Sequence, residues 1–167
     1  MKKTFRIMLA AMLGLSMLAF TACKEKEEDT PDQPSTSYSF IYDGQAVEYG
    51  ASISHAATFE EVNMDFAHVH LLFENKTSDN LETCLKIELV EGPAEMNDIM
   101  ICFGEECKNG TCTWTSSPFT LKPGVNSDML VDFEYFPSRV TSKTTYRFTL
   151  GKGTALADPQ VMLVTVS

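Results

Sequence analysis

Apolar and polar residues alternate along most of the chain from residue 38 onward. At 67–73 every second residue is Ala, Val, Leu or Phe, and the same period of two recurs at 129–135 and 146–150. Because successive side chains of a β-strand point to opposite faces, this pattern predicts strands with one buried face. No long segment here has the 3.6-residue period of a helix, and residues 56–61 could form at most one helical turn.

Turn-forming residues separate these strands. Asp43-Gly44 lies between two short strand-like segments and predicts a two-residue hairpin. Clusters of Gly, Pro, Asn, Asp and Ser supply further turns, at 75–80, 92–93, 123–124 and 151–153. Seven to nine short strands with frequent turns predict an all-β fold, a single two-sheet antiparallel β-sandwich over residues 38–167.

The first 22 residues have the layout of an export signal. Basic residues in the first six positions precede an uncharged apolar run at 7–20, and the small residues Thr21-Ala22 follow. The run is shorter than the roughly 20 residues that a helix needs to cross a bilayer, and it has the length of a signal-peptide core. We therefore predict a signal peptide at 1–22.

A cysteine follows this signal directly. Ala22 before Cys23 resembles the lipobox of bacterial lipoproteins, although Phe20 stands where that motif usually has an aliphatic residue. The resemblance implies that the signal is cut before Cys23, that the Cys23 thiol receives diacylglycerol and that the new amine is acylated. Two or three chains on one residue would anchor the protein stably, whereas a single chain holds only marginally. The alternative is an ordinary secretory signal followed by an unrelated cysteine.

Residues 24–37 contain charged residues, Ser, Thr, Gln and Pro, and no large apolar side chain. Such a segment cannot bury enough surface to offset the entropy of ordering, so we predict a lipidated cysteine and disordered tether at 23–37. The acidic cluster Glu25, Glu27, Glu28 and Asp29 resembles the surface-export signal of Bacteroidota lipoproteins. This resemblance implies an outer-membrane protein exposed on the cell surface, and a plain solvated spacer is the alternative.

The charge balance excludes one class of partner. The chain has 167 residues, 13 Lys and Arg, 23 Asp and Glu, and a formal net charge of -10. Nucleic-acid binding needs basic residues gathered on one face, so we expect no nucleic-acid partner. Cleavage after residue 22 would remove only basic charges, and repulsion from anionic headgroups would then hold the acidic body off the membrane.

Four cysteines follow Cys23, namely Cys84, Cys102, Cys107 and Cys112. An even number in an exported chain predicts two disulfides, for which three connectivities exist. The short loop from Cys102 to Cys107 suits a bridge at a hairpin tip, which would leave Cys84 to pair with Cys112. No C-x₂-C pair is present, as a zinc site or a thioredoxin-like redox site would usually require.

A second resemblance covers residues 81–167. The Cys102–Cys107 loop, the run Phe-Thr-Leu-Lys-Pro-Gly at 119–124 and the strands at 128–136, 145–150 and 161–166 resemble an immunoglobulin-like module of Bacteroidota secreted and surface proteins. The resemblance implies an immunoglobulin-like β-sandwich at the cell surface. It implies no catalytic residue, because a fold does not set a function.

His68-Val69-His70 is the sharpest local motif. On a strand both imidazoles would point to one face, away from the core, and could hold one metal ion. A third ligand would have to be His55, a carboxylate or a partner chain, since Asp65 lies on the other face. A solvated histidine pair is the more common arrangement, so we predict no metal site and keep His68 and His70 as weak candidates.

Two aromatic residues suggest different roles. Trp114 could stack on a sugar ring, but its spacing from Cys112 favours a core position beside a disulfide. Phe103, in the Cys102–Cys107 loop, is the better candidate for an exposed contact.

The sequence contains no recognisable catalytic or cofactor motif. It has no G-x-S-x-G, P-loop or G-x-G-x-x-G, and its paired acidic residues, such as Glu60-Glu61 and Glu105-Glu106, fall in predicted loops. We therefore expect no enzyme activity and no cofactor.

Together these features predict an acylated envelope protein that acts as a non-enzymatic binding or assembly module for an envelope protein or a glycan. One alternative is a fimbrial or adhesin subunit that assembles through an exposed sheet edge. A metal- or haem-binding lipoprotein using His68 and His70 is another. The position of the strand at 161–166 discriminates between the binding module and the fimbrial subunit. An edge position favours strand-exchange assembly, and a central position favours a monomeric module.

Overall fold

The computed structural model describes residues 34–92, 98–109 and 113–167, which belong to one compact unit, Pro31–Ser167. The predicted signal peptide, Cys23 and most of the predicted tether lie outside the described residues. Residues 34–37 of that tether lie against the sandwich. Ser35 is buried, and its backbone N–H donates a hydrogen bond to the carbonyl oxygen of Pro159 at 3.1 Å.

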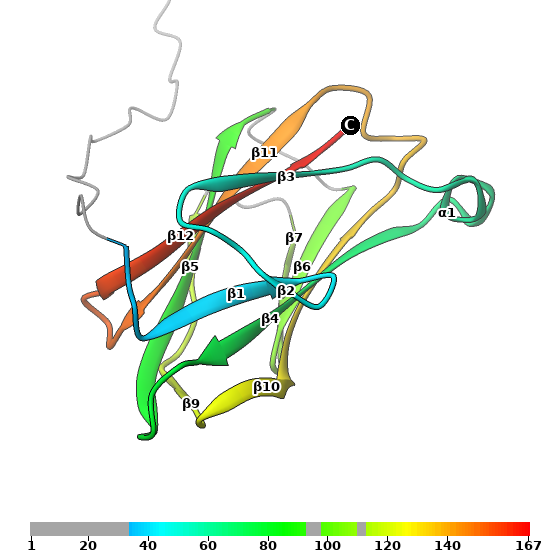
Figure 1. The fold of residues 1–167 in the computed structure, drawn as a ribbon. Coiled ribbons are helices and arrows are strands. Elements are labelled where there is room, and N and C mark those ends of the chain that lie inside the picture. The colour runs from blue at the N-terminus through cyan, green and yellow to red at the C-terminus, as the bar shows by residue number, and fades with distance from the viewer. Residues whose placement is uncertain (1–33, 93–97, 110–112) are drawn as a thin grey trace, which may run out of the picture. The chain divides into compact units, whose positions relative to one another are not determined.

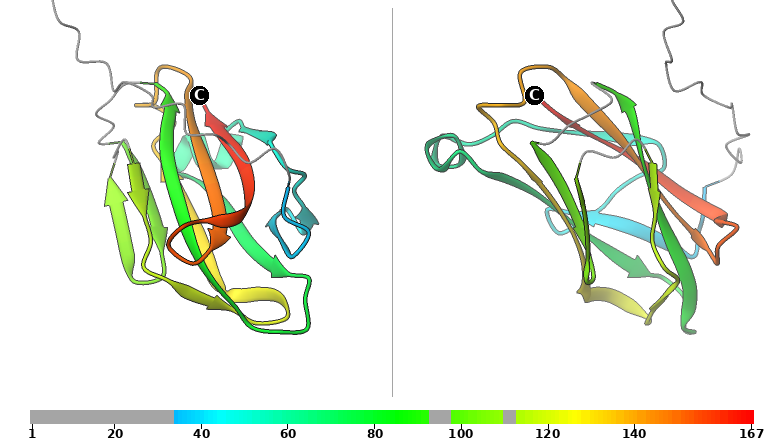
Figure 2. Two further views of the ribbon diagram at one scale, coloured as in Figure 1. Left: turned by 90° about the vertical axis from the view of Figure 1, so that its left-hand side faces the viewer. Right: turned by 180° about the vertical axis from the view of Figure 1, so that it is seen from behind.

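Two six-stranded β-sheets form the predicted sandwich (Figure 1, Figure 2). The strands of the first sheet are, in spatial order, β2 (Gln45–Ala46), β1 (Tyr38–Tyr42), β4 (Ala67–Asn75), β10 (Gly124–Tyr135), β6 (Ile99–Phe103) and β7 (Glu106–Asn109). Those of the second are β3 (Ala51–His55), β12 (Ala157–Val166), β11 (Thr144–Lys152), β5 (Leu81–Glu91) and β8 (Thr113–Thr115), with β9 (Phe119–Leu121) also paired to β5.

The period of two in the sequence becomes an alternation of buried and outward side chains. In β4, Ala67, Val69 and Leu71 are fully buried, while the residues between them face outward. The hairpin between β1 and β2 has the predicted two-residue turn, with φ of 49° at Asp43 and 74° at Gly44. Positive φ at both turn residues matches the right-handed twist of the flanking strands.

Aromatic rings from both sheets fill the space between them. Phe133 of β10 contacts Tyr146 of β11, with 5.3 Å between the ring centroids, and lies 6.3 Å from Phe148 of the same strand. All three side chains are fully buried. Packing of this kind, and not hydrogen bonding along either sheet alone, holds the two layers together.

One strand pair is parallel. β3 pairs with β12 from Met162↔Ala51 to Val166↔His55, so the predicted purely antiparallel arrangement holds for all the described strand pairs except this one. The chain then returns to the first sheet through α1 (Phe59–Met64), which projects from one end of the sandwich in Figure 1 and Figure 2. The helix is slightly longer than the single turn predicted at 56–61.

Local hydrogen bonds explain both ends of α1. Thr58 and Glu61 form a capping box, in which each side chain accepts a hydrogen bond from the other residue's backbone N–H. Asp65 ends the helix in the left-handed conformation, with φ of 54°. The helix buries none of its side chains, so these caps are what define it.

Replacement of the central aromatic ring tests the core. We expect Phe133→Ala to lower the free energy of unfolding by about 3–5 kcal/mol, because the cavity left between two sheets cannot collapse fully. Leu130→Ala, on the same strand but 37% exposed, should change it by less than about 1 kcal/mol. Denaturant unfolding followed by tyrosine fluorescence measures both, and equal effects would contradict this account of the core.

The ion pair between Lys152 and Asp158, whose side chains are partly exposed, makes stability depend on pH. Partial burial raises the pKa of Asp158. Lys152, whose Nζ lies 2.7 Å from Asp158 Oδ2, lowers this pKa through a hydrogen bond and through its charge, and the hydroxyls of Ser35 and Ser37 lower it as well. The lowering effects outweigh the effect of burial. The net pKa is below the ordinary value of 3.8. A carboxylate with a lowered pKa in the folded state stabilises the protein above its ordinary pKa, and this stabilisation is lost as the pH falls.

We therefore expect Asp158→Asn to be less stable than the wild type at neutral pH and to match it more closely as the pH falls below about 4. Denaturant midpoints measured across this range give the comparison. A stability difference that stays constant with pH would show that the side chain acts through its shape and not its charge.

Candidate functional site

The outward face of β4 and β10 carries a group of titratable side chains that includes His68, His70 and Asp132. His70 lies directly across from Asp132, and His68 lies directly across from Glu134. Both histidines face outward because the residues that alternate with them in β4 are in the core. The predicted orientation of His68 and His70 is therefore confirmed.

A change of register in β10 places Asp132 on this face. Asn126 pairs with Phe73 and Val131 pairs with Leu71, so β10 advances five residues where β4 advances two. The three extra residues are an odd number, so they reverse which residues of β10 point inward. Asn126 is buried before this irregularity, whereas Asp132 faces outward after it.

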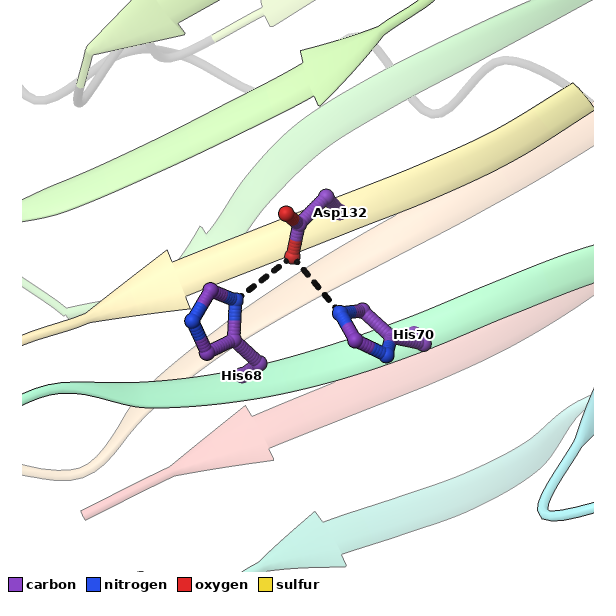
Figure 3. Close-up of side chains that lie close together, drawn as sticks. All are labelled: His68, His70 and Asp132. Carbon is purple, nitrogen blue, oxygen red and sulfur yellow. Dashed lines mark hydrogen bonds and ion pairs between the residues drawn. The ribbon is translucent and has the colours of Figure 1, made fainter. Parts of the chain in front are cut away.

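One carboxylate oxygen contacts both imidazoles. Asp132 Oδ1 lies 2.9 Å from His68 Nδ1 and 3.2 Å from His70 Nε2 (Figure 3). One potential ligand atom from each of the three residues can be chosen so that all lie within 4.8 Å of one another. The side chains are 33%, 56% and 25% exposed for His68, His70 and Asp132, so solvent reaches the group from one side.

Neighbouring side chains hold this group in place. The ring of Phe66 meets the His68 ring edge-to-face, with 4.5 Å between the centroids. Glu134 shares a side-chain hydrogen bond with Asp132. Burial raises the pKa of Glu134, and the Asp132 carboxylate raises it further, while His68 and His70 act in the opposite direction. Glu134 thus holds a proton more tightly than an ordinary glutamate does.

His55, the other histidine considered as a third ligand, belongs to a different group. Its Nδ1 lies 3.5 Å from the Tyr42 hydroxyl, and its Nε2 lies 3.5 Å from a Glu61 carboxylate oxygen. Its ring meets that of buried Tyr135 edge-to-face. Burial, together with nearby Glu61 and Tyr42, raises the pKa of Tyr135 to about 12. Of the three predicted sources for a third ligand, the structure thus supplies a carboxylate, that of Asp132.

The predicted disulfide between Cys102 and Cys107 is confirmed. It joins β6 to β7 at directly paired positions, with a Cα–Cα distance of 4.0 Å. Cys102 is also paired with Asp132 on its other side. The disulfide therefore lies in the same cross-strand row as the histidine and aspartate group.

The predicted pairing of Cys84 with Cys112 stays a prediction, because Cys112 lies outside the described residues. Cys84 is buried in β5 and forms no disulfide within the described part of the chain.

Phe103 is not the exposed contact that the sequence suggested. It is 6% exposed, and its ring packs 4.7 Å from that of Phe119 and 5.7 Å from that of Phe73. Phe103 is the last residue of β6 and points inward, as every second residue of this strand does. The prediction of an exposed contact was therefore wrong. Trp114 is partly buried against the core, as predicted, and lies in the edge strand β8.

Comparisons with known proteins support the fold. No family model matches the sequence, and no curated protein matches it. Among solved structures, the N-terminal domain of PorA matches 77% of this chain and 95% of its own length, with a TM-score of 0.52 and 9% sequence identity.

Two further solved structures are more distant. PapD-like domain 7 of human CEP192 has a TM-score of 0.39 at 9% identity and covers 87% of this chain and 94% of its own. The bacterial hydrophobin BslA has a TM-score of 0.39 at 12% identity and covers 80% and 94%. At these identities the likeness concerns the fold alone, which is a two-sheet β-sandwich. In the residues that the structure describes, no helix is both long and apolar enough to cross a membrane.

Removal of the disulfide tests the cysteine assignment. We expect the pair Cys102→Ser and Cys107→Ser to lower the free energy of unfolding by about 2 kcal/mol, as the entropy of a short closed loop implies. Thermal unfolding with and without a reductant gives the measurement. The wild type should lose more stability on reduction than the double variant does, and any loss that remains in the double variant would report the predicted second disulfide. Equal losses in the two proteins would contradict the assignment of Cys102 and Cys107.

Proposed function

We propose that this protein is an outer-membrane lipoprotein exposed on the cell surface, where its sandwich serves as a non-enzymatic binding or assembly module. An envelope protein or a glycan is its partner, and lipids on Cys23 attach it to the membrane. The support for the anchor comes from the sequence at 1–29, which combines a signal peptide, the cysteine and an acidic cluster.

The observation that carries the binding role is the filled interior. Among the residues that the structure describes, aromatic side chains from both sheets pack together between the layers, so the sandwich offers its outer faces and loops for binding. A shallow hollow of about 250 Å³ near Tyr49 and Lys76 is smaller than the roughly 300–1,000 Å³ of usual small-molecule sites. A macromolecular partner suits such a surface better than a small substrate does.

The position of β12 favours this role over the fimbrial alternative. β12 lies between β11 and β3, so it offers no free edge for strand exchange. The strands at the sheet edges, β2, β7, β3 and β8, are two, four, five and three residues long. Short edge strands are one way in which proteins prevent pairing with a second chain.

Substitution of the lipidation residue tests the proposal. In cells fed an alkyne-tagged fatty acid, the wild-type chain should be labelled and should partition into the detergent phase, because two or three acyl chains anchor it stably. Cys23→Ala should lose both properties. The pair Cys102→Ser and Cys107→Ser, which removes two other cysteines, is the control and should keep both.

Protease treatment of intact cells then tests the location. Cleavage of the anchored chain by an external protease is the expected result. A Cys23→Ala chain that still enters the detergent phase, or a wild-type chain that is protected until the cells are lysed, would contradict the anchor or the surface location respectively.

A further inference from the structure

We propose that His68, His70 and Asp132 form a binding site for a divalent transition-metal ion, with zinc as the reference ion. The site would use His68 Nδ1, His70 Nε2 and Asp132 Oδ1 as ligands and leave a fourth position to water or to a group on a partner. The inference concerns the outer face of the first sheet and does not depend on the lipid anchor.

The spacing of the donor atoms supports the proposal. Zinc binds imidazole nitrogen and carboxylate oxygen at about 2.0–2.2 Å, so neighbouring ligands of a tetrahedral site lie about 3.4 Å apart. The two nitrogen–oxygen distances to Asp132 Oδ1 are 2.9 and 3.2 Å. Small side-chain movements of a few tenths of an ångström would admit the ion, and the partial exposure of His70 provides an entry path.

The chemistry of the donors selects the kind of ion. Imidazole nitrogen suits zinc, copper and nickel, whereas calcium and magnesium prefer oxygen ligands alone. Two imidazoles and one carboxylate form a common three-residue set for zinc sites with an open position. The carboxylate also offsets part of the charge of the ion, which two neutral histidines would leave uncompensated.

The surroundings hold the three ligands nearly in place. Both histidines are paired with β10, His68 with Glu134 and His70 with Asp132, so their backbone cannot shift without breaking this ladder. The Phe66 ring fixes one face of His68. A site built on strands and supported in this way is already organised for an ion.

The competing explanation is a network of ion pairs between the histidines and Asp132 without a metal. Zinc titration of the full-length chain, purified in detergent and stripped of metal, separates the two. We expect one zinc ion per chain by isothermal titration calorimetry. His68→Gln, His70→Gln and Asp132→Asn should each weaken binding at least tenfold. Glu74→Gln, on the same strand and face, should leave it unchanged.

Nuclear magnetic resonance of the imidazole nitrogens makes the test independent of the variants. Zinc should shift the ring nitrogens of His68 and His70 and leave those of His55 nearly unchanged. Saturable binding that persists in the His68→Gln, His70→Gln double variant would assign the ion to other groups, such as thiols, and would overturn the proposal. Failure of the wild type to bind zinc up to millimolar concentration would overturn it as well.

Discussion

The burial of one face of each central strand against the opposite sheet is the constraint on which the rest of the structure depends. Phe133 reaches across the interface to Tyr146 and Phe148, and similar contacts run along β4, β10, β11 and β5. Because side chains alternate with a strict period of two, each inward residue commits its neighbours to the outer face. The core thus determines which polar side chains are available for function.

This alternation of inward and outward side chains determines where His68, His70 and Asp132 lie. His68 and His70 cannot turn inward without expelling Val69 and Leu71 from the core. The opposing strand must likewise keep Val131 and Phe133 inside, which holds Asp132 outside. Packing energy from the interior is therefore what keeps three polar side chains together on a solvent-facing surface, where their mutual attraction alone would be weak.

The sequence predicted features whose causes are local. Alternation predicted the strands, the Asp43-Gly44 pair predicted a hairpin, and the short spacing between Cys102 and Cys107 predicted their disulfide. Asp132 could not be predicted as a partner of the histidines, because its place depends on three extra residues in β10 that alternation within one strand does not reveal. Phe103 was misjudged for a related reason, since its burial depends on Phe119 and Phe73 in other strands.

The pairing of β3 with β12 has a consequence for how the chain acquires its shape. These neighbours in the second sheet are separated by about a hundred residues, so β3 has no partner on that side until β12 has been synthesised. Contacts between such distant segments form late and slowly, because a long loop must close first. The second sheet can therefore be completed only after its C-terminal strand has been made.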